Sequence, residues 1–290
     1  MHTLTGRVVL ADNLEHLATL ADQSVDLIYV DPPFNTGRLQ SLERLQTVRD
    51  EERGDRIGFQ GRRYRTVRLG SQSFADVYSD YLEFLEPRLC EFRRVLASTG
   101  SLYVHLDYRE VHYVKVRLDE IFGRSCFLNE VIWAYDYGAR TRRRWPPKHD
   151  TILLYAKDER RYYFDSRAVE RIPYLAPGLV GPEKAARGKL PTDVFWLTIV
   201  PTSGRERTGY PTQKPLTLLR RLVQASSPAG GLVADFFAGS GTTGAAALEL
   251  GRRFLLVDDN PEACAVMARR LAAPGVAFVS GSPSADGAAG

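Results

Sequence analysis

The sequence predicts an α/β protein whose strands form a mostly parallel sheet with helices on both faces. Short apolar runs in which β-branched residues recur, such as 25–30 and 232–236, are spread along the chain. Most of these runs precede a segment whose apolar residues repeat every three or four positions, which is the spacing of an amphipathic helix. Strands that alternate with helices usually enter a sheet in the same direction, so the alternation favours a parallel sheet.

The expected elements follow one another in a regular order. Strands are expected at 7–10, 25–30, 101–106, 129–133, 151–155, 232–236 and 254–257, and helices at 14–20, 74–96, 108–122, 215–225, 242–250 and 261–271. Residues 38–72 have no convincing period and are rich in Arg, so we expect a mobile basic loop there. Residues 162–209 are rich in Pro, Gly and charge, which indicates an insertion with a local fold. The Gly- and Ala-rich residues 280–290 predict a disordered tail.

Composition and cysteine usage narrow the class of protein. The 290 residues fit one large domain, or one domain with a sizeable insertion, and 44% of them are hydrophobic. No run approaches the roughly 18 consecutive apolar residues of a membrane span, so no membrane association is expected. The three cysteines form no C-x-x-C pair, and the five histidines show no H-x-x-x-H spacing. We therefore expect a cytoplasmic protein without a metal.

Positive charge is concentrated in two segments, although the net charge is only +4. The segment 38–68 contains nine arginines and five acidic residues. The other segment places five cations within nine residues: Arg140, Arg142, Arg143, Arg144 and Lys148. Such clusters are typical of surfaces that contact the phosphates of nucleic acid. The alternative is a solvated face without a partner.

The second half of the chain contains a glycine-rich turn directly after an apolar strand. Gly239 and Gly241 lie in this turn, and residues without a Cβ let the main chain approach a ligand closely. Asp258 ends the following strand, 23 residues after Asp235, where a carboxylate can accept hydrogen bonds from ribose hydroxyls. Capping of the next helix is the alternative role for Asp258. The turn reads G-S-G-T-T-G from Gly239 to Gly244, and the cofactor favoured here is S-adenosylmethionine, because Asp235 at the strand end can meet its ammonium group.

A short motif, Asp31-Pro32-Pro33-Phe34, follows the first buried strand. The exocyclic amino group of adenine or cytosine is a poor nucleophile, because its lone pair is delocalised into the ring. Two acceptors for its N–H groups favour a pyramidal nitrogen, and the carboxylate of Asp31 with the carbonyl of Pro32 can supply them. The prolines fix the backbone, and Phe34 offers an apolar face to an extracted base. A rigid Pro-Pro turn without a catalytic role is the alternative.

The two motifs together predict methyl transfer to an amino group, provided that both lie at one edge of the sheet. At this point the chain resembles the β class of bacterial amino-group DNA methyltransferases, in which D-P-P-Y/F precedes an F-x-G-x-G loop. The matching segments are V-V-L-A-D-N at 8–13, and residues 31–34, 148–153, 210–215, 235–243 and 251–254. The resemblance implies a Rossmann-like, seven-stranded, mostly parallel sheet with an antiparallel last strand and a circularly permuted motif order. It also implies a catalytic and cofactor-binding domain at 1–133 and 208–279, with an inserted target-recognition region at 134–207.

The resemblance assigns roles to individual residues. Catalysis would depend on Asp31, Pro32, Pro33 and Phe34. S-adenosylmethionine would be held by Asp12 near its adenine, by Thr212, Gln213 and Lys214 near its methionine end, and by Asp31, Asp235, Phe236, Phe237, Gly239, Ser240, Gly241, Thr242, Thr243 and Asp258. DNA would contact Arg140, Arg142, Arg143, Arg144 and Lys148, with Tyr135, Tyr137 and Trp145 among them available for base stacking. His105, Asp107 and His149 are weaker candidates for the same site.

The favoured activity is site-specific methylation of adenine N6 in double-stranded DNA, because cytosine-N4 relatives more often carry Ser where this chain has Asp31. Cytosine-N4 methylation on the same scaffold is the main alternative. Methylation of RNA or of a protein glutamine is disfavoured by the order of the motifs. A DNA-binding regulator with an inactive methylase fold is disfavoured by the intact motifs. A cognate restriction enzyme and a second copy of the chain are further partners that the resemblance allows.

Overall fold

The computed structural model describes residues 4–35, 38–49, 56–57, 63–76, 78, 80–138, 140–201 and 204–280. It divides into two compact units, one made of Met1–Phe34 with Asp80–Gly290 and the other of Asn35–Ser79. The larger unit is an α/β fold with a mostly parallel sheet, so the predicted fold class is confirmed.

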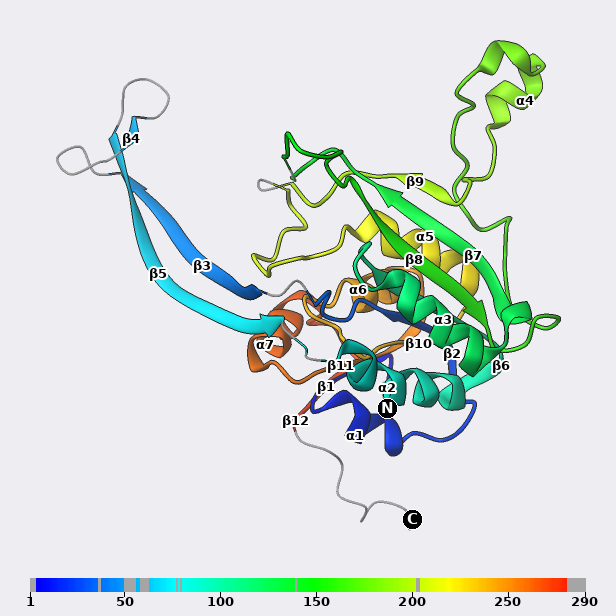
Figure 1. Ribbon diagram of the computed structural model, residues 1–290, viewed down its shortest axis with the longest axis horizontal. Helices are drawn as coiled ribbons and strands as arrows, with labels where there is room; N and C mark the ends of the chain where they lie inside the picture. The colour runs from blue at the N-terminus through cyan, green and yellow to red at the C-terminus, as the bar shows by residue number, and fades with distance from the viewer. Residues whose placement is uncertain are drawn as a thin grey trace. The chain divides into compact units, whose positions relative to one another are not determined.

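The sheet of the larger unit has nine strands in the described part of the chain, in the order β12-β1-β11-β10-β2-β6-β8-β7-β9 (Figure 1). Their bounds are β1 Gly6–Leu10, β2 Val25–Val30, β6 Leu96–Leu106, β7 Phe127–Ala134, β8 His149–Ala156, β9 Val194–Trp196, β10 Leu232–Asp235, β11 Arg253–Asp258 and β12 Val276–Ser280. The sheet is thus two strands wider than the seven expected. The single antiparallel strand is β8, which lies inside the sheet between β6 and β7.

Helices cover both faces of this sheet (Figure 1). The helices are α1 Asn13–Ala18, α2 Tyr81–Val95, α3 Val111–Phe122, α4 Pro182–Arg187, α5 Leu216–Ser226, α6 Thr242–Glu249 and α7 Pro261–Arg270. Helices α1, α2 and α3 pack next to one another, whereas α5 packs against α6, and α7 against β1 and β11. The core between the sheet and the second group joins Leu27 and Tyr103 of the strands to Leu218 and Leu222 of α5. Because β-strand side chains alternate between faces, the next residues along β2, such as Ile28, serve the other helical layer.

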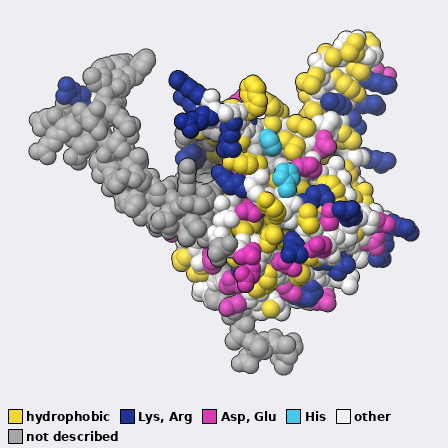
Figure 2. Space-filling view, viewed as in Figure 1, with side chains coloured by type: hydrophobic (Ala, Val, Ile, Leu, Met, Phe, Trp, Pro, Cys, Tyr) yellow, Lys and Arg dark blue, Asp and Glu magenta, His cyan; other side chains and the backbone are white. Residues whose placement is uncertain are grey.

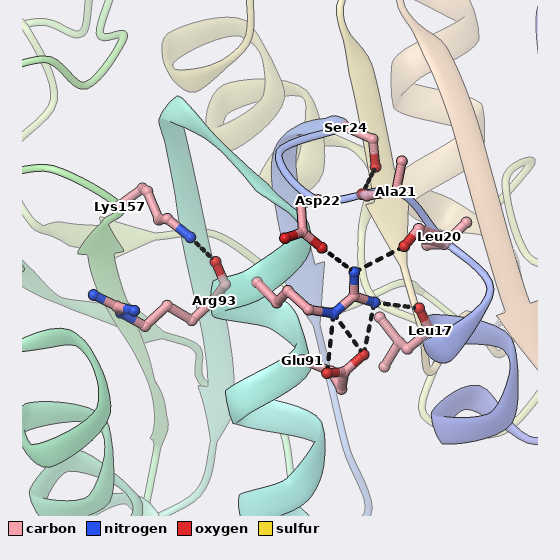
Figure 3. A network of polar contacts seen from close by, with 9 residues as sticks. Leu17, Leu20, Ala21, Asp22, Ser24, Glu91, Arg93 and Lys157 are labelled. Carbon is pink, nitrogen blue, oxygen red and sulfur yellow. Dashed lines mark hydrogen bonds and ion pairs between the residues drawn. The ribbon is translucent and has the colours of Figure 1, made fainter.

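Arg94 links α1 to α2 near the ends of both helices. Figure 3 shows the partners of its network, among them Leu17, Leu20 and Glu91. Its guanidinium donates hydrogen bonds to the carbonyls of Leu17 at 2.7 Å and Leu20 at 2.8 Å, and it pairs with Glu91 on its own helix. The last carbonyls of a helix have no partner within the helix, and α1 has only six residues. A cation at this end therefore satisfies these carbonyls and also complements the helix dipole.

The smaller unit corrects the expectation for residues 38–72. Instead of a loop without regular structure, the described residues form β3 Arg38–Arg49, β4 Arg56–Ile57 and β5 Arg63–Asp76. β3 and β5 pair antiparallel from Arg38↔Asp76 to Arg49↔Tyr64. The helix expected at 74–96 is accordingly shorter. It begins at Tyr81, where the Oδ1 of Asp80 caps it by accepting the amide of Glu83 at 2.9 Å.

The boundaries predicted for the inserted region also change. β8 lies within 134–207 and yet pairs with β6 in the interior of the sheet, and β9 extends the sheet beyond β7. The segment with α4 and the short 3₁₀ helix Pro177–Leu179 stands apart from the sheet (Figure 1). The tail expected at 280–290 lies outside the described residues, except for Ser280 at the end of β12. Among the described residues, no helix is long and apolar enough to cross a membrane.

Candidate active site

The two motifs singled out in the sequence lie at the same edge of the sheet. β10 pairs parallel with β2 on one side and with β11 on the other, so the carboxyl ends of these three strands are adjacent. Asp31 follows β2 directly, Asp235 ends β10, and Asp258 ends β11. The predicted juxtaposition of the two motifs is confirmed, and it falls where α/β sheets bind their ligands.

One carboxylate oxygen of Asp31 is paired with a cation, and the other has no partner among the described residues. Its Oδ2 forms an ion pair with the Nζ of Lys214, and the Asp31 side chain is 17% exposed. Its Oδ1 is buried and has no hydrogen-bond partner among the described residues. A buried acceptor without a donor is costly, so this atom is suited to accept an N–H from a ligand.

A buried polar network supports Phe34. The Phe34 ring lies 5.9 Å from the ring of His105, which is fully buried. His105 shares a 2.7 Å hydrogen bond with the hydroxyl of Tyr29 and contacts Asp150 Oδ2 at 3.3 Å, while Tyr135 donates to Asp150 Oδ1 at 3.1 Å. Burial alone would raise the pKa of Asp150, but the hydrogen bonds from His105 and Tyr135 and the nearby charge of Lys214 outweigh it and lower that pKa. Because an ionised carboxylate only accepts, Nε2 of His105 is the donor in its contact with Asp150.

The glycine-rich turn adopts a backbone that other residues disfavour. Gly239 has φ +50° and Gly241 has φ +72°, both in the left-handed region. A Cβ on Gly241 would lie 2.7 Å from the Cγ of Met267. Gly244 has a packing role instead, because a Cβ there would lie 2.6 Å from the Cδ1 of Leu256 on β11. The third glycine of the turn therefore lets α6 pack closely against β11.

The hydroxyl groups of the turn hold it in place. Thr243 donates to Asp235 Oδ2 at 2.6 Å, and Thr242 donates to the carbonyl of Lys214 at 3.1 Å. Arg270 of α7 donates to the Thr242 hydroxyl at 2.8 Å and to the Ser240 carbonyl at 3.1 Å. These side chains are thus committed within the protein, and the main chain of the turn is rigidly presented.

Two carboxylates at the strand ends have raised pKa values. Burial, the main cause, raises the pKa of Asp235 to about 7, and the charges of Asp31 and Asp258 add to the effect. Burial likewise raises the pKa of Asp258 to about 6, although this carboxylate accepts the amides of Gly239 at 2.7 Å and Asn260 at 3.0 Å. A cationic or hydroxyl-bearing ligand that contacts these groups would favour their charged forms.

The remaining residues expected to hold the cofactor differ in their placement. Phe236 is fully buried and stacks on Phe92 at 5.3 Å, so only its main chain is left for a cofactor contact. Phe237 is half-buried, with its ring 6.2 Å from that of Phe84. Thr212 is exposed and has φ +55°, an uncommon value for a residue with a Cβ.

Gln213 holds its own loop together. Its Oε1 accepts the amide of Thr208 at 2.9 Å and its Nε2 donates to the carbonyl of Glu206 at 2.8 Å. The side-chain amide is therefore used locally, and its part in the site is to fix the residue that follows, Lys214.

Asp12 is tied to the strand edge by residues that the sequence patterns did not single out. Its Oδ1 caps α1, and its Oδ2 pairs with Arg88 at 3.3 Å. Arg88 also donates to Asn13, which in turn donates to the carbonyl of Phe236 at the end of β10. A signal for Arg88 was present, because it is a charged residue on the apolar face of α2, between Leu85 and Phe92.

The arginine cluster is exposed in the loop between the end of β7 and the start of β8. Arg140, Arg142, Arg143 and Arg144 are all exposed, and Figure 2 shows Lys and Arg side chains gathered over the loop between these strands. Trp145 is 93% exposed and Tyr137 is 68% exposed, so neither belongs to a local core. Lys148 instead closes the loop, because its Nζ donates to the carbonyls of Asp136 and Gly138 at 2.8 and 2.6 Å.

The weaker candidates are now placed. His149 is exposed at the start of β8. Asp107 pairs with the nearby Arg109 and is buried. Only His105 lies beside a motif residue, as a buried support behind Phe34. No group of three His, Cys, Asp or Glu residues that could hold a metal is found in the part of the chain that the structure describes.

The fold and the site define a Rossmann-like enzyme of the methyltransferase class. Residues 25–269 match the family model N6_N4_Mtase, described as a DNA methylase, so the chain belongs to the N6/N4 DNA methylase family. DNA methylases of this family depend on S-adenosylmethionine, and the predicted cofactor is confirmed at the level of the family.

Curated relatives match most of this chain and about three quarters or more of their own length. The chain is 28% identical to the type II methyltransferase M.HpaI of Haemophilus parainfluenzae, over 91% of this chain and 74% of the relative. It is also 28% identical to the DNA adenine methyltransferase YhdJ of Escherichia coli K12, over 91% of this chain and 82% of the relative.

Solved structures share the fold. The PvuII cytosine-N4-specific DNA methyltransferase has a TM-score of 0.64 at 17% identity and covers 94% of this chain and 88% of its own. The M1.HpyAVI complex with S-adenosylmethionine has a TM-score of 0.59 at 20% identity, covering 92% of this chain and all of its own. TTHA0409 of Thermus thermophilus, also complexed with S-adenosylmethionine, has a TM-score of 0.57 at 21% identity, covering 94% of this chain and 99% of its own.

Proposed function

We propose that this DNA methylase transfers a methyl group from S-adenosylmethionine to N6 of an adenine that is flipped out of double-stranded DNA at a specific site. The observation that carries the proposal is the buried Oδ1 of Asp31, which has no hydrogen-bond partner in the part of the chain that the structure describes and lies next to the turn at Gly239–Gly241. An acceptor at this position suits the amino group of a base, and the cofactor supplies an electrophilic methyl group when it is bound.

The motif after β2 activates the amino group by hydrogen bonding. Asp31 Oδ1 and the carbonyl of Pro32 accept its two N–H groups, which localises the lone pair on nitrogen for attack on the methyl group. Positive charge that develops on the nitrogen is stabilised by the Asp31 carboxylate, and the proton leaves after transfer. Because the prolines hold the acceptors in place, they need no reorganisation during the reaction. Phe34 stacks on the extracted base, and His105 fixes the ring from behind.

The strand ends of β10 and β11 suit the cofactor. Asp235 is a buried carboxylate whose raised pKa reflects an unfavourable burial of charge, which the ammonium group of the cofactor would offset. Asp258 suits the ribose hydroxyls, and Gly239 and Gly241 leave room for close approach of the main chain. Asp12 is near enough to β10, through Arg88 and Asn13, to border the adenine of the cofactor.

Two observations bear on the target base. The first residue of the motif is Asp, and a curated relative that matches 91% of this chain is named a DNA adenine methyltransferase. Both favour adenine. The fold is also similar to a cytosine-N4-specific enzyme, which keeps cytosine N4 as the second candidate.

The experiment is to incubate the protein with labelled S-adenosylmethionine and unmethylated double-stranded DNA, digest the DNA to nucleosides and separate them. The proposal expects label in N6-methyldeoxyadenosine. Label in N4-methyldeoxycytidine would contradict the choice of base, and the absence of label from every nucleoside would contradict transfer to a DNA amino group. Sequencing that detects methylated bases would then give the recognition site.

A further inference from the structure

The two motifs are joined by one side chain, that of Lys214. Its Nζ forms the ion pair with Asp31 Oδ2 and lies 5.1 Å from the centre of the Phe34 ring. The lysine side chain is only 10% exposed. A buried lysine keeps its charge only where a carboxylate or other acceptors compensate for the lost hydration, so its position beside Asp31 is specific.

The other end of Lys214 is fixed to the cofactor turn. Its carbonyl accepts the Thr242 hydroxyl, which Arg270 holds from α7, and the loop before it is closed by Gln213. Pro215 follows and is the N-cap of α5. The main chain of Lys214 is therefore held on both sides, and its ammonium group reaches Asp31 from a fixed origin.

We propose that Lys214 is a positioning residue that holds Oδ2 of Asp31, so that Oδ1 is the oxygen presented to the target amino group. The inference rests on the proposed function and deepens it, because it assigns to Lys214 a role in the methyl-accepting half of the site rather than at the methionine end of the cofactor. A carboxylate with one oxygen fixed by a cation has one orientation in which the other oxygen can accept a hydrogen bond.

The groups around Asp31 show why a cation is needed there. Tyr29 lies on the same strand, and burial and the Asp31 charge both raise the pKa of its hydroxyl well above the ordinary range, so it carries no charge. Asp235 faces Asp31 from β10 and is a second carboxylate in the same buried edge. Asp150 of β8 also lies within the field of Lys214. Among the described residues that face Asp31, Lys214 is the cation that pairs with it.

Loss of the Lys214 ammonium group should therefore free the Asp31 carboxylate to rotate. Oδ1 would then face the target amino group in only some of the orientations that the side chain adopts. Removing the lysine would thus slow methyl transfer, although the carboxylate that accepts the N–H is still present.

The test is the mobility of the Asp31 side chain in the full-length, cofactor-free protein. Aspartate side chains are labelled with ¹³C, and Asp31→Asn identifies the Asp31 signals. In Lys214→Met and in Lys214→Gln, ¹³C relaxation should show a more mobile Asp31 side chain than in the wild type. Lys214→Arg should keep the side chain ordered. Lys115→Met, which removes a lysine from an ion pair with Asp119 on α3, should leave the mobility of Asp31 unchanged.

The split between kcat and KM gives the functional readout. In Lys214→Gln kcat should fall by about tenfold to 10²-fold, the scale of a misplaced reacting group, with KM for S-adenosylmethionine nearly unchanged. A folded Lys214→Gln protein in which the mobility of Asp31 does not change would overturn the inference, even if the wild type methylates adenine. Conversely, a wild type that methylates no amino group would contradict the proposed function, while the NMR relaxation would still decide the role of Lys214.

Discussion

Asp31 is the residue on which the proposed chemistry depends most directly. Asp31→Asn keeps the size of the side chain but removes its charge and replaces an acceptor by a donor. We expect the rate of methyl transfer in a single turnover to fall by about 10²- to 10³-fold or more, because the transition state loses a preorganised electrostatic interaction. S-adenosylmethionine affinity, measured by calorimetry, should change little. A near-normal transfer rate in a folded variant would contradict the role given to Asp31.

The raised pKa of Asp235 predicts how cofactor binding depends on pH. Its pKa is raised to about 7, so below that pH the carboxyl group is mostly neutral in the free enzyme. A bound ammonium group favours the anion, and binding must therefore release a proton at acidic pH. The affinity for S-adenosylmethionine should rise from pH 5 to pH 7 by up to about tenfold per unit and then level off.

The raised pKa of Asp258, about 6, steepens the lower part of this dependence. Calorimetry in buffers of different ionisation enthalpy measures both the affinity and the released protons. Asp235→Asn should bind more weakly and lose most of the slope above pH 6. A wild-type affinity that does not change between pH 5 and pH 7 would exclude Asp235 from the ammonium contact.

Helix α1 buries a histidine in the core, and this residue makes the stability of the fold sensitive to acid. His16 is 2% exposed, and neither of its ring nitrogens has a partner among the described residues. Burial lowers its pKa, and the charge of Arg7 lowers it further. The fold therefore favours neutral histidine, whereas the unfolded chain takes up a proton below the ordinary pKa of about 6.5.

The stability that His16 contributes is present above about pH 6.5 and lost as the pH falls towards its lowered pKa in the folded state. The loss approaches about 1.4 kcal/mol per pH unit while only the unfolded state is protonated. His16→Leu should reduce the difference in unfolding free energy between pH 7.5 and pH 5.5, measured with urea. His112→Gln, which changes an exposed histidine on α3, should leave that difference unchanged. An equal acid sensitivity in His16→Leu and the wild type would contradict this account.

Local sequence patterns predict the strands and helices that contain an apolar run or a regular repeat of apolar residues. They miss the elements that have neither. The strands β2 and β10 and the helices α5 to α7 were expected within a few residues of their bounds, because each buries one apolar stripe or run. The short strands β9 and β12 are partly exposed edge elements without such a run. β3 and β5 are held by hydrogen bonds to each other, and neither strand shows a convincing period of apolar residues. The sequence therefore predicts a loop where the structure has paired strands.

The candidate site likewise contains features that the sequence predicts and features that it does not. The motif residues Asp31 and Asp235 could be placed at one edge from sequence, because parallel strands bring their carboxyl ends together. The ion pair between Lys214 and Asp31 could not, because it depends on the path of a side chain across segments far apart in the chain. The support of Phe34 by His105 was hidden for the same reason, since it requires β6 and β8 to be neighbours.

For the whole molecule, the direction of the strands determines where DNA would meet the site. β2 and β6 are parallel, β8 is antiparallel to β6, and β7 is antiparallel to β8, so β7 runs in the same direction as β2. The loop between β7 and β8 therefore projects from the same edge of the sheet as Asp31. The exposed arginines of this loop lie on the side from which a flipped base would enter.

Replacing these arginines therefore tests whether DNA contacts this edge of the sheet. Replacing Arg142, Arg143 and Arg144 by Gln should weaken DNA binding, and the slope of log affinity against log salt should become shallower by about 0.9 for each phosphate that the protein no longer neutralises. The control replaces exposed arginines at the opposite ends of β7 and β8, namely Arg124, Arg160 and Arg161. Fluorescence anisotropy over a salt series compares the two triple variants, which make the same change in net charge. If both variants flatten the slope equally, general charge attraction rather than contact at this edge binds the DNA. If neither changes it, the arginine loop does not contact the phosphates.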